Sequence, residues 1–93
     1  MEEQLQPCFD YLEVMLAQCL ASAEEQGYPY LVFSWDILNE NGILKPTYEK
    51  AYIKDLNHIF RLVKTRQIDL NRISIFDVAT GQEVDKDIFK KEN

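Results

Sequence analysis

Alternation of apolar and polar residues marks 28–38 as the strand around which the rest of the chain is organised. This run is the most apolar in the sequence and contains its only tryptophan. Successive side chains of a strand point to opposite faces, so the alternation predicts one fully apolar face and one mixed face. The apolar face consists of Leu31, Phe33, Trp35 and Ile37. The mixed face, which indicates partial exposure or contact with a partner, consists of Tyr30, Val32, Ser34, Asp36 and Leu38.

Two segments have the periodicity of amphipathic helices. In residues 5–26, the apolar side chains fall within an arc of about 140° on a helical wheel. Pro7 is tolerated only in the first turn, so the regular helix is expected to begin near Gln6, and Gly27 is suited to end it. A second helix is expected over 47–64, after Pro46. Its predicted apolar arc consists of Tyr48, Tyr52, Ile53, Leu56, Ile59, Phe60 and Val63.

The remaining segments indicate turns and further strands. Residues 39–42 form a turn signal, after which 43–44 are expected to add a short returning strand. The β-branched and aromatic run 72–78 predicts a strand with large apolar groups on both faces, hence a central one. It is followed by a hairpin through Gly81 to 83–85, in which Phe76 is expected opposite Val84.

These elements predict an α+β fold in the order α-β-(β)-α-β-β. A helical crossover would place 28–38 parallel to 72–78, giving a small mixed sheet of three to four strands. Both amphipathic helices are expected on one face of that sheet, over the apolar side of 28–38. The length fits a single globular domain over 1–93. Residues 86–93 are expected to form a tail that adds a turn of helix around Ile88 and Phe89 and then frays.

Charge divides the chain into two halves. Residues 1–44 contain eight acidic residues and no Lys or Arg, whereas 45–93 contain ten basic and eight acidic residues, so the halves carry −8 and +2. An acidic first half argues against nucleic acid as a partner and favours a basic protein surface, because complementary charge speeds association.

The two cysteines and the first residues of the sequence favour a reducing compartment. Cys8 and Cys19 are eleven residues apart on one helix, roughly 16 Å, and so cannot bond to each other. Both fall on the apolar arc, which predicts two small buried side chains. No apolar run is long enough to cross a bilayer, and the first residues lack the basic start of a signal peptide. A cytoplasmic location is therefore expected.

Chemistry-bearing motifs are absent, so no cofactor and no catalytic residue is predicted. The sequence lacks the common metal-binding, nucleophile-elbow and phosphate-loop patterns. His58 is flanked by Lys54 and Arg61 on a predicted outer face, as a solvated histidine would be. The best small-ligand or metal candidate is Asp36 with Asp77, near Ser34, at the ends of two strands expected to be parallel.

A basic stripe is expected on the outer face of the second helix, where it could contact an anionic partner. It consists of Lys50, Lys54, Arg61 and Lys64. The stripe carries no interleaved aromatic residue for base stacking, so nucleic acid is disfavoured relative to a solvated helix face or an acidic protein surface.

The leading prediction is a non-enzymatic protein–protein interaction domain of inhibitor, immunity or adaptor type that presents an acidic first helix to a basic partner. The alternatives are a homodimer that buries the second sheet face, and the ligand site at Asp36 and Asp77. The predicted partner-binding residues lie on the outer side of the first helix and the mixed face of the first strand. They are Asp10, Glu13, Val14, Glu24, Tyr30 and Val32.

Overall fold

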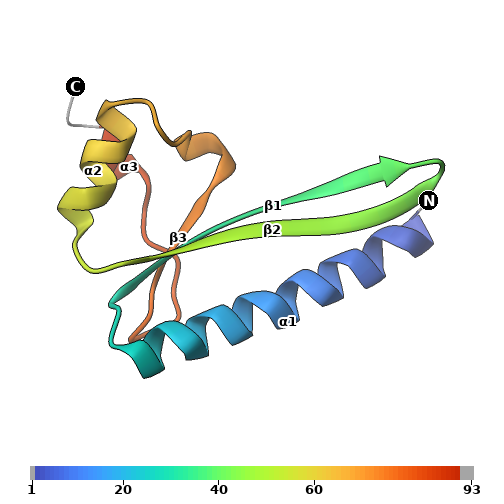
Figure 1. Ribbon diagram of the computed structural model, residues 1–93, viewed down its shortest axis with the longest axis horizontal. Helices are drawn as coiled ribbons and strands as arrows, with labels where there is room; N and C mark the ends of the chain where they lie inside the picture. The colour runs from blue at the N-terminus through green and yellow to red at the C-terminus, as the bar shows by residue number, and fades with distance from the viewer. Residues whose placement is uncertain (1, 91–93) are drawn as a thin grey trace.

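The structure is a computed structural model that describes residues 2–90, and the side chains of residues 5–89. The elements in chain order are α1 (Glu2–Gln26), β1 (Tyr30–Glu40), β2 (Ile43–Ile53), α2 (Leu56–Lys64), the 3-10 turn η1 (Leu70–Arg72), β3 (Ser74–Asp77) and α3 (Asp87–Lys90). The α+β class and a three-stranded sheet are confirmed. Figure 1 shows a long β1–β2 hairpin above α1, with α2 and α3 gathered at the end away from the hairpin turn.

The sheet has the order β2-β1-β3, and both pairings are antiparallel. The predicted parallel pairing of 28–38 with 72–78 is therefore wrong. The prediction took the helical crossover to start from β1, but β1 first returns as β2 through a tight hairpin. The crossover through α2 thus joins β2 to β3, which run parallel to each other on either side of β1.

The segment 47–53 is strand rather than helix, which is the main error of the sequence prediction. β2 runs over Ile43–Ile53, and α2 covers only Leu56–Lys64. Tyr48 and Tyr52 are four residues apart, a spacing that puts side chains on one face of a helix and equally on one face of a strand. Pro46 lies in an edge strand, where a residue without an N–H is tolerated. The helix begins only where Asp55 caps it by accepting from the Asn57 amide at 2.9 Å.

The turn predicted over 39–42 closes the hairpin. Its two central residues have positive φ, 56° at Asn41 and 82° at Gly42, which is the backbone of a type I′ turn. The Asn39 side chain accepts from the Gly42 amide at 3.0 Å and holds this conformation. The turn therefore fixes the register of β1 against β2, with Glu40 opposite Ile43.

The helices cover opposite faces of the sheet, not one face as predicted. Leu31 and Phe33 pack with Cys19 and Ala23 of α1. The intervening residue, Val32, packs on the other face in a cluster with Ile59 of α2 and Phe89 of α3. That cluster also contains Ile53, Leu70, Ile73 and Ile75. The mixed face of β1 is thus a core face over its first residues.

The C-terminal strand and tail differ in detail from the prediction. β3 is an edge strand of four residues rather than a central one, and both its faces are apolar because a helical layer covers each. Beyond Gly81, Phe76 lies opposite Glu83 in a single bridge instead of opposite Val84. Phe89 is buried in α3, as the predicted turn of helix requires. Fraying was predicted for a tail whose last residues, 91–93, lie outside the described part of the chain.

The two-sided core yields a stability prediction. Leu31→Ala should lower the free energy of unfolding by about 2–5 kcal/mol, because the fully buried side chain leaves a cavity that its neighbours fill only in part. Ile43→Ala is the matched control, since Ile43 is 62% exposed and should cost less than about 0.5 kcal/mol. Urea unfolding followed by circular dichroism measures both, and equal losses would contradict this assignment of the core.

Candidate functional site

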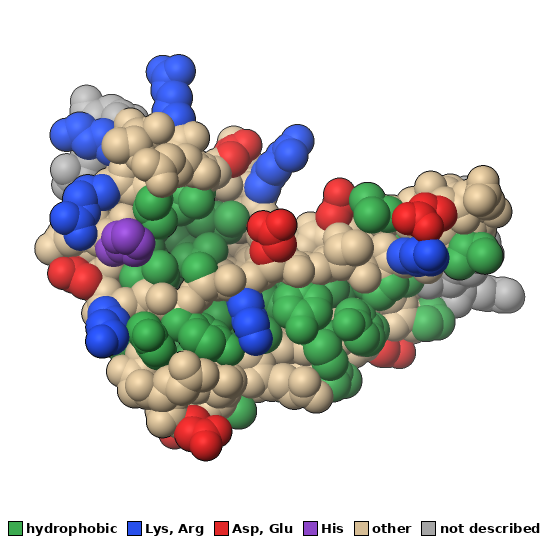
Figure 2. All heavy atoms as spheres, viewed as in Figure 1, with side chains coloured by type: hydrophobic (Ala, Val, Ile, Leu, Met, Phe, Trp, Pro, Cys, Tyr) green, Lys and Arg blue, Asp and Glu red, His purple; other side chains and the backbone are tan. Residues whose placement is uncertain are grey.

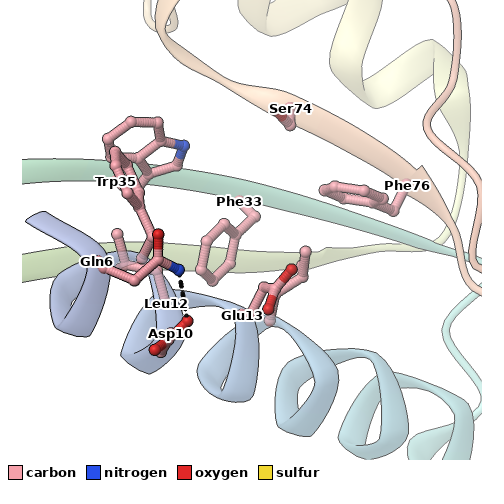
Figure 3. A pocket seen from close by; sticks show the side chains of 10 residues that line it. Gln6, Asp10, Leu12, Glu13, Phe33, Trp35, Ser74 and Phe76 are labelled. Carbon is pink, nitrogen blue, oxygen red and sulfur yellow. Dashed lines mark hydrogen bonds between the residues drawn. The ribbon is translucent and has the colours of Figure 1, made fainter.

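An aromatic groove runs between α1 and the sheet, on the side where β3 begins at Ser74. It encloses about 280 Å³. It is lined by Gln6, Phe9, Asp10, Leu12, Glu13, Leu16, Phe33, Trp35, Ser74 and Phe76. Figure 3 shows the rings of Trp35, Phe33 and Phe76 in sequence along the sheet, with side chains of α1 opposite them. We refer to this feature as the aromatic groove.

The groove exposes aromatic surface that the core does not use. Phe9 is 40% and Trp35 49% exposed, and their rings meet edge to face with centroids 5.7 Å apart. Phe33, the neighbour of Trp35 on the same face of β1, is buried, and its ring stacks on that of Tyr48 with centroids 5.4 Å apart. The two exposed rings are therefore fixed relative to each other and stand on a rigid base, which lowers the entropic cost of binding a ligand between them.

Acidic side chains line the helical wall of the groove. Asp10 accepts a hydrogen bond from the Gln6 side-chain amide at 2.9 Å, one helical turn away. Glu13 lies three residues further on the same flank of α1, and both carboxylates are exposed. Among the residues whose side chains the structure describes, no Lys or Arg lines the aromatic groove, so its electrostatic field attracts cations.

Two other hollows flank the same hairpin. One lies on the opposite side of α1, where Cys8 donates through its Sγ to the Leu44 carbonyl at 3.8 Å and Tyr11 contacts Tyr48. The other is a polar groove on the second sheet face, between β1 and the segment that precedes β3. It is lined by Ser34, Trp35, Asp36, Thr47, Glu49, Asn71, Arg72, Ile73, Ser74 and Lys86. Lys86 is already engaged there, since its Nζ donates to the carbonyls of Leu70 and Ile73 at 2.9 Å each.

The predicted partner-binding residues are not brought together as one surface. Asp10 and Glu13 line the aromatic groove, and Val14 is exposed beside them at 52%. Glu24 is exposed near the far end of α1. Tyr30 and Val32 belong to the cluster under α2, and Val32 is buried, so it cannot contact a partner.

The predicted basic stripe is divided between elements. Lys50 lies on β2 and Lys54 follows that strand, whereas Arg61 and Lys64 lie on α2. The ammonium groups of Lys50 and Lys54 lie 5.4 and 5.5 Å from the ring centroids of Tyr52 and Tyr28. The stripe required a helix through 47–53, so its helical spacing is lost. On the face drawn in Figure 2, the Lys and Arg side chains are separated by other side chains and form no continuous row.

Asp36 and Asp77 lie too far apart to share a ligand. Asp77 is opposite Tyr30, six residues from Asp36, which corresponds to roughly 20 Å along an antiparallel strand. Each carboxylate instead accepts a nearby backbone amide, that of Ile37 for Asp36 and that of Ala79 for Asp77. Within residues 2–90 no group of three His, Cys, Asp or Glu side chains is placed to hold a metal ion. The prediction that Asp36 and Asp77 meet at the ends of two parallel strands is therefore wrong.

The aromatic groove was not predicted from the sequence, although several of the residues that line it were assigned other roles there. Phe9 and Trp35 were assigned to core faces by periodicity, and the structure exposes both. Position on the helical wheel gave no signal of this exposure, since Leu20 lies nearer the edge of the apolar arc than Phe9 and still packs against the core. In the described part of the chain, no helix is long and apolar enough to span a membrane.

The buried thiols provide a chemical prediction. Both cysteines are free and buried, and burial raises the pKa of the Cys19 thiol, an effect that nearby Lys50 offsets only in part. A raised pKa means less thiolate at a given pH, so Cys19 should react slowly with a disulfide reagent at pH 7–8, and faster as pH rises. Native and urea-unfolded protein should differ by at least about tenfold in rate. Equal rates would show that the thiol is open to solvent.

Comparison with known proteins adds no function to this geometry. No protein-family model, no curated protein and no solved structure matches the chain. The feature of the described residues that is best suited to binding is the aromatic groove with its acidic wall, because exposed, fixed aromatic rings and unpaired charge meet there.

Proposed function

We propose that the protein is a non-enzymatic protein–protein interaction domain, of inhibitor or adaptor type, that binds a basic and apolar segment of another protein in the aromatic groove. The observation that carries the proposal is the exposed Phe9–Trp35 pair, framed by the carboxylates of Asp10 and Glu13. A volume of about 280 Å³ suits one or two large side chains of a partner rather than a cofactor.

The aromatic pair supports the proposal through the energetics of interfaces. Tryptophan and other aromatic residues are enriched among the few side chains that carry most binding energy. Trp35 is about half exposed, so burying its free surface in a complex would add favourable hydrophobic free energy without disturbing the core. Phe33, which lies beside Trp35 on the same face of β1, is already buried and provides a fixed neighbour for a bound side chain.

The acidic wall supports a basic partner. Residues 1–44 contain no Lys or Arg, so no base from the first helix or from β1 neutralises Asp10 and Glu13. Such a one-sided field raises the rate at which a cationic segment meets the groove and disfavours acidic competitors. Specificity for apolar side chains then comes from the rings.

Selection of short peptides from a displayed random library tests this function. The intact chain is the bait, and Trp35→Ala serves for counter-selection because it removes the exposed ring at little cost to the core. Enriched peptides should combine an aromatic or large aliphatic residue with Lys or Arg. A synthetic copy of the best peptide should bind Trp35→Ala at least about tenfold more weakly than the native chain.

Charge reversal provides the second arm of the same test. Asp10→Lys with Glu13→Lys should slow association of the peptide and flatten its salt dependence. Glu25→Lys is the matched control, since it reverses a charge on α1 roughly 18 Å along the helix from Glu13. The proposed function would be contradicted if the selected peptides bound Trp35→Ala as tightly as the native chain. It would also be contradicted if Glu25→Lys slowed their association as much as the double reversal of Asp10 and Glu13.

A further inference from the structure

We propose that the partner segment binds as an added β-strand along the free edge of β1 over residues 35–39. This inference rests on the proposed function and adds the mode of binding: main-chain hydrogen bonds to β1, with alternate side chains of the partner entering the aromatic groove. The occupant is an extended segment of another protein, with apolar residues at alternate positions and Lys or Arg among them.

The free edge exists because β3 is much shorter than β1. β3 pairs with β1 only from Tyr30 to Phe33, whereas β1 pairs with β2 along its whole length to Glu40. In the described part of the chain, residues 34–40 therefore have a strand neighbour on the β2 side alone. η1 turns the chain away before β3, and Lys86 fixes that bend through the carbonyls of Leu70 and Ile73.

The register shows which backbone groups point to the free side. The Val78 amide donates to the Pro29 carbonyl at 2.9 Å, so the hydrogen-bonded pairs between β1 and β3 fall at odd-numbered β1 residues. Continuing that alternation, Trp35, Ile37 and Asn39 direct their N–H and C=O groups to the open edge. The Ile37 amide is occupied by the Asp36 carboxylate at 2.8 Å. This contact keeps the middle donor satisfied in the unbound state.

A groove that could accept side chains lies on each face of the sheet beside this edge. Trp35 and Ser74 line the aromatic groove on one sheet face and the polar groove on the other. A strand laid against residues 35–39 would extend the sheet beyond Ser74, the residue at which β3 begins. Its alternate side chains would enter the two grooves in turn, because successive residues of a strand face opposite sides.

The outer edge of β2 is a poorer site for strand addition. The even-numbered residues of β2 point their backbone groups outward, by the same alternation. Among them Pro46 has no N–H to offer, and the Leu44 carbonyl already accepts from Cys8 of α1. The β1 edge beyond Phe33 contains no proline, and among the described residues its one engaged backbone group is the Ile37 amide, which the flexible Asp36 side chain can release.

Charge favours a foreign segment over a second copy of the chain. Two-fold pairing of β1 with itself would bring two acidic walls, each with Asp10 and Glu13, to the same face of one continuous sheet. Residues 1–44 supply no base to balance them. A segment that carries Lys or Arg meets the opposite situation, since every charged side chain lining the aromatic groove is acidic.

The test uses a synthetic peptide of about nine residues, with Ile, Phe and Ile at alternate positions, Ser or Thr between them and Lys at both ends. Its affinity for the full chain and for Trp35→Ala is measured by isothermal titration calorimetry, because the variant lacks the only tryptophan and so has no tryptophan fluorescence to follow. Two further versions carry backbone N-methyl groups on one or the other alternate set of residues. One version should bind at least about tenfold more weakly because its hydrogen bonds to β1 are lost, and the other should bind within about twofold of the parent.

Variants of Ile37 test the same mode from the side of the protein. Ile37→Pro removes an N–H that faces the open edge and no hydrogen bond to β2, so the variant should fold and lose the peptide. Ile37→Ala is the matched control, because it keeps the N–H and should retain binding. Circular dichroism confirms that each variant is folded.

The outcomes separate this inference from the proposed function. If the peptide's affinity depends on Trp35 but the two N-methylated peptides bind with equal affinity, strand addition is overturned and the groove remains the interaction site. No Trp35-dependent binding of the peptide would contradict both. A dimer of the free chain in sedimentation equilibrium that Ile37→Pro dissociates would show that a second copy occupies the edge, and would also overturn the inference.

Discussion

The structure depends on the burial of β1 from both sides over Leu31, Val32 and Phe33. Leu31 and Phe33 anchor the cluster under α1, and Val32 anchors the cluster under α2 and α3. Three consecutive residues of β1 therefore contribute to both hydrophobic layers. β1 is also the central strand of the sheet, with hydrogen bonds to β2 on one side and to β3 on the other. Fully burying side chains of this size contributes about 1.5–3 kcal/mol each, so this short run provides much of the net stability of the domain.

The same constraint determines where the molecule is left open. β3 pairs with β1 only where the two layers meet, and beyond Phe33 the hairpin continues with α1 below it. Toward the hairpin turn, past the polar groove, Figure 1 shows no described helix or strand over the other face. Trp35 is the first residue of the apolar face past that limit, which is why it combines a rigid position with about half of its surface exposed. The proposed interaction site thus lies where β1 continues beyond the hydrophobic core.

Much of the architecture was accessible from the sequence because it depends on local signals. The amphipathic period of α1, the turn over 39–42 and the two faces of β1 were all predicted from residue spacing, as was the α+β class. The 47–53 segment failed because Tyr48 and Tyr52 satisfy helix and strand spacing equally, and Pro46 suits either a helix start or an edge strand. Choosing between them requires the pairing with β1, which is not a local property.

The candidate site was less accessible than the fold. Asp10 and Glu13 were identified from charge alone, but Phe9 and Trp35 were assigned to the core because periodicity shows which face a residue is on and not how far the covering elements extend. The short reach of β3 and the separation of the helices onto opposite faces are tertiary facts. Because of them, Val32 lies in the core and Trp35 is about half exposed.

Residue-resolved amide hydrogen exchange of the free protein tests the central claim, that β1 is paired on both sides only up to Phe33. Leu31 and Phe33 should exchange slowly through their bonds to β3, and Ser34, Asp36 and Leu38 slowly through their bonds to β2. Trp35 and Asn39 should exchange much faster than these neighbours, which gives an alternating pattern beyond Phe33. Protection of Trp35 and Asn39 equal to that of Leu31 would contradict the account, because it would mean that the edge is already covered.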